Sequence, residues 1–197
     1  MKSTTLFIIR HGQTDWNTIG KIQGHIDIPL NDKGIEQAQS VASFLKKRNM
    51  SFDALYSSDL QRAQQTAAPI SEAFSLNIIT KPHLRERHVG VLQGLTKPQV
   101  YEQYGKHWED VVDTAPGGET KTEFLKRFIN QISLIAKNHI NESVVIVTHG
   151  HAIRQFIAYA GYDKDECPAI TNASIITVKY HHADERQIEL ISIECAE

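Results

Sequence analysis

Two continuous runs of apolar residues mark the centre of the expected fold. Residues 6–9 and 144–147 contain no polar side chain, and a glycine follows each run within three residues. Such runs predict strands that are buried on both faces, as in a parallel sheet covered by helices. Arg10-His11 and Thr148-His149 then stand at the carboxyl ends of buried strands, where open α/β sheets bind their ligands.

Between and after these strands, the apolar spacing changes to that of helices. Apolar residues recur every three or four positions in four stretches that end near residues 48, 74, 138 and 160. The first of these helices is expected at residues 34–48, with Asn31 or Asp32 as its cap. The second is expected to follow Ser57, Ser58 and Asp59, which are all favourable capping residue types.

The remaining segments complete an alternating order of strands and helices. Short strands are expected at residues 54–56 and 77–80, and an edge hairpin at residues 174–180 and 187–193. Residues 98–108 are expected to form an irregular helix, and residues 17–30 and 84–94 to form loops. This order predicts an α/β fold, a three-layer α/β/α sandwich with a mostly parallel sheet and an antiparallel edge.

Composition narrows the class of protein. The 197 residues suit one domain, expected to span residues 1–197, and 41% of them are hydrophobic and 22% charged. A net charge of −2 argues against nucleic acid or a membrane surface as the main partner. Cys167 and Cys195 lack metal-ligand or redox spacing, and no signal-type apolar region opens the chain. We therefore expect a cytoplasmic protein.

The polar residues at the strand ends favour an anion site. If the two buried strands are neighbours, His11 and His149 meet above the carboxyl edge of the sheet. Arg62, in the first turns of the second helix, would join Arg10 there beside a helix N-terminus. Two arginines, two histidines and a helix N-terminus suit a phosphate dianion. Glu86, in a glycine-flanked loop, is the candidate general acid.

Each of these residues also has a simpler interpretation. Arg62 could be a solvated helix arginine, and His149 a histidine satisfied at a strand end. Glu86 could pair with Arg85 or Arg87 at the surface. These alternatives stay open from the residues taken one at a time.

The ordered set of motifs resembles the histidine phosphatase superfamily, the phosphoglycerate-mutase-like proteins. The matching pieces are Arg10-His11-Gly12-x-Thr14-x-x-Asn17, Gln23-Gly24-x-x-Asp27-x-Pro29-Leu30, Gly34, Ser57-Ser58-x-Leu60-x-Arg62-Ala63-x-x-Thr66-Ala67, Leu84-x-Glu86-x-x-x-Gly90-x-x-x-Gly94, Pro116-Gly117-Gly118-Glu119 and Thr148-His149-Gly150. They span nearly the whole chain in the order found in the family.

The resemblance implies a phosphoenzyme mechanism without a metal or another cofactor. The catalytic residues would be His11 as nucleophile, Glu86 as acid and then base, and His149, which would bind the phosphoryl oxygens together with Arg10 and Arg62. The residues expected to bind the substrate phosphate are Arg10, Asn17, Gln23, Gly24, Arg62 and Gly150. His11 must present an unprotonated ring nitrogen, so we expect its other nitrogen to bond to a backbone carbonyl. The neighbouring cations should also disfavour its protonated form.

The sequence gives weaker evidence on whether the chain resembles the phosphatases or the mutases of this family. Residues 86–97 resemble the mutase pattern, except that Val89 stands where mutases of this type usually have Tyr. Against a mutase, proteins of that type are longer chains with an inserted pair of arginines that grips the substrate carboxylate, whereas residues 99–114 contain no arginine. The turn Pro116-Gly117-Gly118-Glu119 also resembles the phosphatase branch. We therefore expect a phosphoric monoester hydrolase of the histidine acid phosphatase type, acting on a small phosphorylated metabolite. A cofactor-dependent phosphoglycerate mutase and a non-catalytic phosphate-binding module are the alternatives, and the substrate and oligomeric state stay open.

Overall fold

The two continuous apolar runs become adjacent strands at the centre of a six-stranded sheet. The computed structural model describes residues 2–163, 167–183 and 187–196, so Met1 and Glu197, the ends of the expected domain, lie outside the described residues. The strand order is β3-β2-β4-β1-β5-β6. The strands are β1 (Ser3–Arg10), β2 (Ala54–Ser57), β3 (Ile78–Thr80), β4 (Ser143–Thr148), β5 (Ser174–His181) and β6 (Ile188–Cys195).

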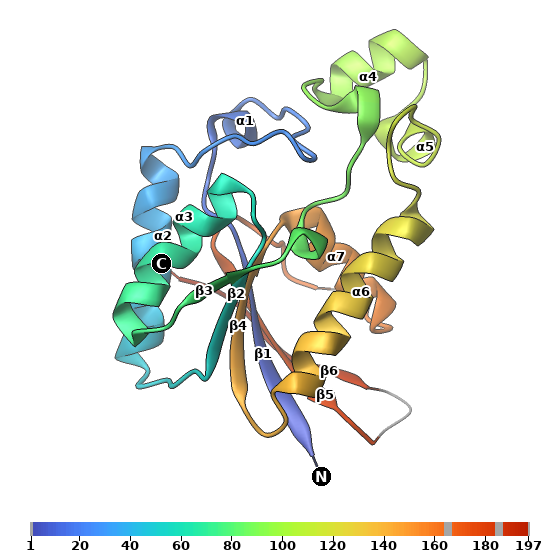
Figure 1. Cartoon of the computed structure of the whole chain (residues 1–197). Coiled ribbons are helices and arrows are strands. Elements are labelled where there is room, and N and C mark those ends of the chain that lie inside the picture. The colour runs from blue at the N-terminus through green and yellow to red at the C-terminus, as the bar shows by residue number, and fades with distance from the viewer. Residues whose placement is uncertain (1, 164–166, 184–186, 197) are drawn as a thin grey trace.

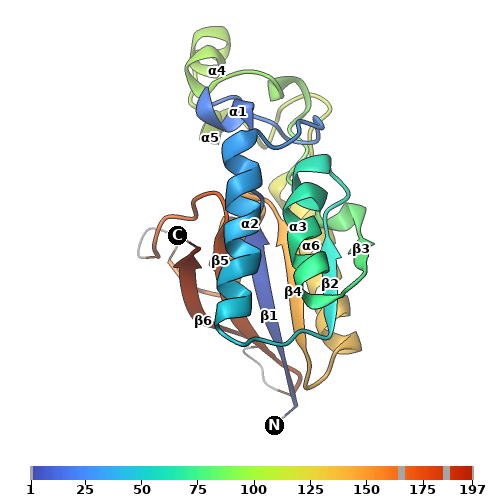
Figure 2. The same ribbon diagram turned by 90° about the vertical axis from the view of Figure 1, so that its left-hand side faces the viewer.

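The directions of the strands agree with the expected fold class. β3, β2, β4 and β1 pair in parallel, whereas β5 and β6 add an antiparallel edge. Helices α2 (Asp32–Lys47) and α3 (Gln61–Phe74) lie on one face of the sheet (Figure 2). Helices α6 (Lys121–Asn138) and α7 (Gly150–Tyr159) lie on the other (Figure 1). The three-layer sandwich is confirmed.

Alternation along β1 separates two hydrophobic cores. Leu6 and Ile8 pack into the core beneath α6 and α7, and Phe7 and Ile9 into the core beneath α2 and α3. Successive side chains of a strand point to opposite faces, so a strand covered on both sides must be apolar throughout. The register pairs Arg10 of β1 with Thr148 of β4, and the two strands therefore end side by side.

The sequence correctly predicts the N-cap of α2 but not that of α3. Asn31 caps α2, and its side chain accepts a hydrogen bond from the Gly34 amide at 2.9 Å. The expected cap of α3 is wrong, because Leu60 is its N-cap and makes no side-chain bond to the helix. Ser58 is instead directed to His149, at 2.9 Å between Oγ and Nε2.

The segments beyond the carboxyl ends of the parallel strands hold most of the differences from expectation (Figure 1). These are α1 (Asp15–Thr18), η1 (Pro82–Leu84), η2 (Gly90–Leu92), α4 (Lys97–Tyr104) and α5 (Trp108–Val111). α1 overlaps the start of an expected loop, and the expected irregular helix is two helices separated at Gly105, which adopts φ +62°. A small third core, centred on Leu92 and Val100, joins η2, α4 and α5. Nowhere in the described ranges is a helix long and apolar enough to cross a membrane.

Candidate active site

The parallel register brings the two strand-end histidines together. The His11 amide donates to the Thr148 carbonyl at 2.9 Å, which extends the pairing of β1 and β4 by one residue. The ring centroids of His11 and His149 lie 5.1 Å apart, with an angle of 62° between the ring planes. Both side chains are buried, at 3% and 0% exposure for the two residues. The meeting expected from the two similar strand ends is therefore confirmed.

His11 is held as a neutral ring with one nitrogen available. Its Nδ1 lies 2.7 Å from the Gly12 carbonyl oxygen, which can only accept a hydrogen bond. Nδ1 therefore carries the proton, and Nε2 keeps its lone pair. Burial, followed by the charges of Arg62 and Arg10, holds the pKa of His11 well below its ordinary value of 6.5. Both expectations for this ring, the carbonyl partner and the effect of the cations, are confirmed.

Arg62 is fully enclosed and its guanidinium faces the site. Its residue is 1% exposed, so the interpretation as a solvated helix arginine is wrong. Nη1 donates to the Ile26 carbonyl and Nη2 to the Gly24 carbonyl, both at 2.8 Å. Burial lowers the pKa of Arg62 to about 10, with Glu86 and Asp27 acting in the opposite direction. The group stays charged at neutral pH and is oriented by backbone oxygens.

Arg10 has one side-chain donor without a partner among the residues that the structure describes. Its Nη1 donates to the Ile170 carbonyl at 2.7 Å, whereas its buried Nε makes no hydrogen bond to the described residues. An unpaired buried donor costs free energy unless a ligand or water satisfies it. Burial, and then Arg154, lower the pKa of Arg10 to about 10. The orphaned Nε–H suits an anion at this position.

Both ring nitrogens of His149 are engaged by protein groups. The Nε of Arg62 can only donate, and it lies 3.2 Å from Nδ1, so Nδ1 accepts. Burial, and then Arg62 and His11, hold the pKa of His149 well below 6.5. The neutral ring therefore has its proton on Nε2 and donates it to Ser58 Oγ. A direct bond from His149 to a phosphate oxygen requires exchange of one of these partners.

Glu86 is oriented by the backbone of two segments. Its Oε1 accepts from the Arg87 amide at 3.0 Å, and its Oε2 from the His151 amide at 2.9 Å. His151 lies in the first turn of α7, which starts at Gly150. The carboxylate is thus fixed at a helix N-terminus, and it makes no ion pair with Arg85 or Arg87, since those arginines pair with Asp59 and Asp113.

The remaining expected residues lie around the same pocket. Asn17 accepts through Oδ1 from Thr14 and Asn172, and its amide NH₂ makes no bond to the described residues. Gln23 is 8% exposed, and its Oε1 has no hydrogen-bond partner among the described residues. Gly24 adopts φ +52°, and a Cβ there would collide with the Gln93 side chain.

Gly150 leaves room for an arginine. A Cβ at this position would lie 2.8 Å from the Nε of Arg10. The glycine therefore allows Arg10 to pass close to the start of α7. It also opens the first turn of that helix toward the pocket.

These residues enclose a cavity of about 180 Å³, here named the phosphate pocket. It is lined by Arg10, His11, Asn17, Lys21, Ile22, Gln23, Gly24, Arg62, Glu86, Gly150, His151 and Arg154. Among these residues there are four Arg and Lys side chains and one carboxylate, which favours a dianion. His149 lies behind Arg62 rather than on this lining. The start of α7 lines the pocket through Gly150 and His151, and the first turn of α3 lines it through Arg62. The first amide of α3, on Gln61, is already engaged, because it donates to Asp27.

Four lining residues were not expected from the sequence: Lys21, Ile22, His151 and Arg154. Arg154 follows Gly150 by four positions and so shares one face of α7 with it, a signal that helical spacing could have provided. Lys21 lies in an irregular segment where spacing gives no such signal. In the part of the chain that the structure describes, no group of three or more His, Cys, Asp or Glu side chains could hold a metal ion.

Comparison with known proteins gives the family. A family model described as the histidine phosphatase superfamily (branch 1) matches residues 6–193. The phosphoglycerate mutase-like protein 4 of Arabidopsis thaliana is 36% identical over 193 residues, which is 94% of this chain and 83% of that relative. The metal-independent phosphoserine phosphatase of Arabidopsis thaliana is 39% identical over 159 residues, which is 77% of this chain and 66% of that relative.

A solved structure agrees with these relatives. The crystal structure of a phosphoserine phosphatase mutant from Entamoeba histolytica, in complex with phosphoserine, matches with a TM-score of 0.78 at 28% identity and covers 98% of both chains. The arrangement of elements is therefore shared over nearly the full length. The chain belongs to the histidine phosphatase superfamily.

Proposed function

We propose that this protein is a metal-independent phosphomonoesterase that acts on a small phosphorylated metabolite through a phosphohistidine at His11. The observation that carries the proposal is the neutral His11 ring, which is bonded through Nδ1 to the Gly12 carbonyl and lines a cationic pocket together with Arg10, Arg62 and Glu86. Phosphoryl transfer depends mainly on in-line positioning and on stabilising charge at the equatorial oxygens. The pocket combines a fixed nucleophile with that charge.

In the first step, Nε2 of His11 attacks phosphorus as the ester P–O bond breaks. Glu86 in its protonated form gives its proton to the departing alkoxide oxygen, and the alcohol leaves. Arg10, Arg62 and the amide NH₂ of Asn17 bind the oxygens of the transferred group. The Nδ1–H bond to Gly12 stabilises the ring as it becomes positively charged on forming the P–N bond.

In the second step, water attacks phosphorus on the side that the alcohol has left. Glu86, now ionised, takes the proton from that water, the P–N bond breaks and inorganic phosphate forms. His11 regains its lone pair, and Glu86 is protonated again. Gln23, Gly24 and Gly150 shape the pocket around the phosphate, and His149 orients Arg62 through its Nδ1.

The relatives support a hydrolase but include a name from the mutase branch. The metal-independent phosphoserine phosphatase and the Entamoeba histolytica phosphoserine phosphatase favour hydrolysis. The name phosphoglycerate mutase-like protein keeps the mutase as a second candidate. The two activities separate by product: a hydrolase releases free phosphate at the rate of the dephosphorylated alcohol, whereas a mutase gives isomer faster than phosphate.

The decisive experiment traps the intermediate. Wild-type protein is mixed with radiolabelled phosphate ester in the presence of chelator, quenched, and searched for an acid-labile phosphohistidine. We expect the label on His11 of the wild type and a rate of phosphate release that the chelator does not change. In His11→Ala we expect neither a labelled protein nor released phosphate. Substantial phosphate release by His11→Ala with a native circular dichroism spectrum would exclude His11 as the nucleophile. No turnover of any ester by the wild type would favour the non-catalytic phosphate-binding module.

A further inference from the structure

A second, larger cavity adjoins the phosphate pocket. It has a volume of about 530 Å³, and we name it the leaving-group cavity. It shares Ile22, His151 and Arg154 with the phosphate pocket. A volume of this size is within the range of small-molecule sites, of roughly 300–1,000 Å³. A group attached to a phosphate in the smaller pocket would therefore extend into this cavity.

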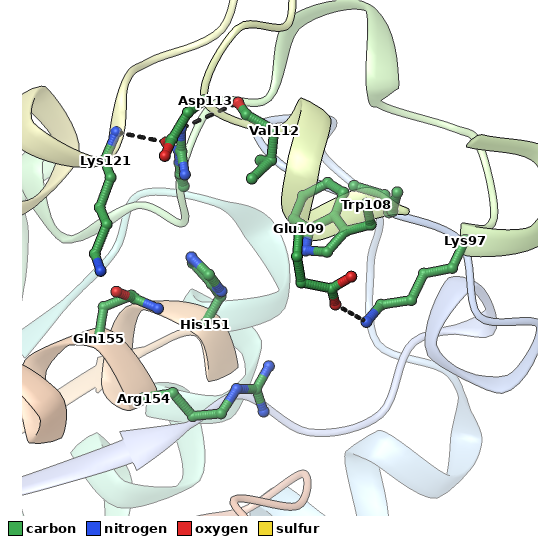
Figure 3. A pocket seen from close by; sticks show the side chains of 11 residues that line it. Lys97, Trp108, Glu109, Val112, Asp113, Lys121, His151, Arg154 and Gln155 are labelled. Carbon is green, nitrogen blue, oxygen red and sulfur yellow. Dashed lines mark hydrogen bonds and ion pairs between the residues drawn. The ribbon is translucent and has the colours of Figure 1, made fainter. Parts of the chain in front are cut away.

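The charges on the walls of this cavity do not balance. Its cationic side chains are Arg87, Lys97, Lys121 and Arg154, and its carboxylates are Glu109 and Asp113. Each carboxylate already has a partner, because Glu109 pairs with Lys97 at 2.8 Å (Figure 3) and Asp113 pairs with Arg87. The side chains of Arg154 and Lys121 make no hydrogen bond or ion pair with the described residues. Two positive charges are thus left to face the cavity.

The apolar surroundings of Arg154 and Lys121 strengthen the hydrogen bonds that these two cations can make to an anion. Trp108, Val112 and Ile22 supply apolar walls, and the His151 ring lies edge-on to Trp108 with 6.5 Å between centroids. Lys121 extends from the start of α6 toward Gln155 on α7, and Arg154 extends from α7 below the Glu109–Lys97 pair (Figure 3). Partial exclusion of water makes a charge-assisted hydrogen bond more favourable than at an open surface.

We propose that the leaving-group cavity binds an alcohol that carries its own anionic group, a carboxylate or a second phosphate, and that Arg154 holds this anion. Arg154 lines both cavities, so it can reach an anion a few bonds away from the transferred phosphate. Lys121 lines only the larger cavity and serves longer leaving groups. The inference rests on the proposed function and names the substrate class of the same site.

The cations of the leaving-group cavity bear on the expectation that residues 99–114 gave for acidic substrates. That segment lacks arginine, which predicted that an acidic substrate would be held poorly. The structure shows that α6 and α7, outside the segment, contribute unpaired cations to the same cavity. These cations cannot be predicted from the sequence of residues 99–114 alone, because that segment, α6 and α7 meet only in the folded chain.

The test uses pairs of esters that differ in one anionic group. O-phosphoserine and O-phosphoethanolamine differ only in the carboxylate, and propane-1,3-diol bisphosphate and its monophosphate differ only in the second phosphate. We expect the wild type to prefer the anionic member of at least one pair by about tenfold or more in kcat/KM, the usual effect of one charge-assisted hydrogen bond. The pair that shows the preference identifies the anion.

Two variants and a control assign the effect. Arg154→Gln is expected to reduce the preference about tenfold, and Lys121→Gln to reduce it by a smaller factor. Lys126→Gln, an exposed lysine of α6 that lines neither cavity, is expected to keep the preference of the wild type. Equal rates of the wild type on both members of each pair, or equal slowing of both members by Arg154→Gln, would overturn the inference.

A binding measurement separates this inference from the proposed function. The same ester pairs are titrated calorimetrically into His11→Ala, and into His11→Ala combined with Arg154→Gln. Tighter binding of the anionic member, lost with Arg154, supports the leaving-group cavity even if no ester is hydrolysed. Hydrolysis without any difference in affinity or rate between the members would leave the phosphatase proposal intact and exclude the cavity as an anion site.

Discussion

At the scale of single residues, the reacting groups are held by backbone atoms. The Gly12 carbonyl fixes His11, the carbonyls of Gly24 and Ile26 fix Arg62, and two backbone amides fix Glu86. Backbone partners cannot rotate away as side chains do, so these groups are oriented before a substrate arrives. Preorganisation of this kind is a major part of charge stabilisation in active sites.

The role of Glu86 leads to a prediction that depends on the leaving group. A positioned general acid accelerates departure of a poor leaving group and matters little for a good one. Glu86→Gln should therefore slow hydrolysis of alkyl phosphates by about 10²–10⁴ and of aryl phosphates much less. Steady-state kinetics with a series of esters of increasing alcohol pKa measures this as a steeper dependence on the leaving group. Glu36→Gln, at an exposed position of α2, is the control.

Equal slowing of alkyl and aryl esters by Glu86→Gln would argue against the acid role. In that outcome the carboxylate would act in a step common to both substrates, such as attack by water. Burst kinetics would then separate formation of the phosphoenzyme from its breakdown. A slowed second phase with an intact burst would leave Glu86 only the role of base.

The sequence reveals the site residues at strand ends but not their partners. Arg10, His11 and His149 could be predicted because buried strands deliver them to one edge of the sheet. The contacts of His149 with Ser58 and Arg62 depend on how α3 packs, which local spacing does not encode. Ser58 looked like a helix cap for the same reason, since its residue type suits both roles.

At the scale of elements, the strands and the long periodic helices were predictable, whereas the short helices α1 and α5 were not. The sheet and its four covering helices follow from apolar runs and helical spacing. The four residues of α1 are stabilised by a capping box between Thr14 and Asn17, and α5 packs through Val111 into a small local core. Segments this short carry too few apolar positions to define a period.

Gly34 of α2 gives a prediction whose sign opposes helix propensity. Replacing Gly by Ala inside a helix normally stabilises it by about 0.5–1 kcal/mol. At Gly34, however, a Cβ would collide with backbone atoms of Gln13, in the loop that follows His11. Gly34→Ala should therefore lower the free energy of unfolding by about 1–3 kcal/mol, the usual cost of overpacking. Urea denaturation measures this difference.

The same variant should also disturb the site. Displacement of the loop at Gln13 moves the backbone next to Gly12, whose carbonyl orients His11. We expect a lower kcat for Gly34→Ala at a temperature where the variant is still folded. Lys33→Ala, an exposed neighbour on α2, controls for the substitution itself. A stabilised and fully active Gly34→Ala would show that α2 and the loop do not pack as closely as the structure indicates.

At the scale of the whole molecule, charge is distributed unevenly. The chain has a net charge of −2, yet the phosphate pocket and the leaving-group cavity are both cationic. The cations of the two cavities also disfavour the protonated form of the buried histidines. Burial, followed by neighbouring arginines or other cations, lowers the pKa of His11 and His149, and burial is also the main cause of the lowered pKa of His151.

These histidines predict how stability depends on pH. A histidine that is neutral in the folded state but titrates near 6.5 when unfolded destabilises the fold below pH 6.5, because there only the unfolded chain binds the extra proton. Between pH 7 and 5, His11 and His149 should each reduce the free energy of unfolding by up to about 2 kcal/mol, the limit that an unfolded pKa near 6.5 sets. Urea titrations at a series of pH values should show this loss, and it should be smaller in His149→Gln. The loss should persist in His107→Gln, which removes an exposed imidazole.

The range from pH 7 to 5 lies above the range where paired carboxylates such as Asp59, whose pKa is lowered by Arg85, take up protons. Stability that is constant or rises as the pH falls from 7 to 5 would show that the two rings are not neutral in the folded protein, and the proposed nucleophile would then lack its lone pair.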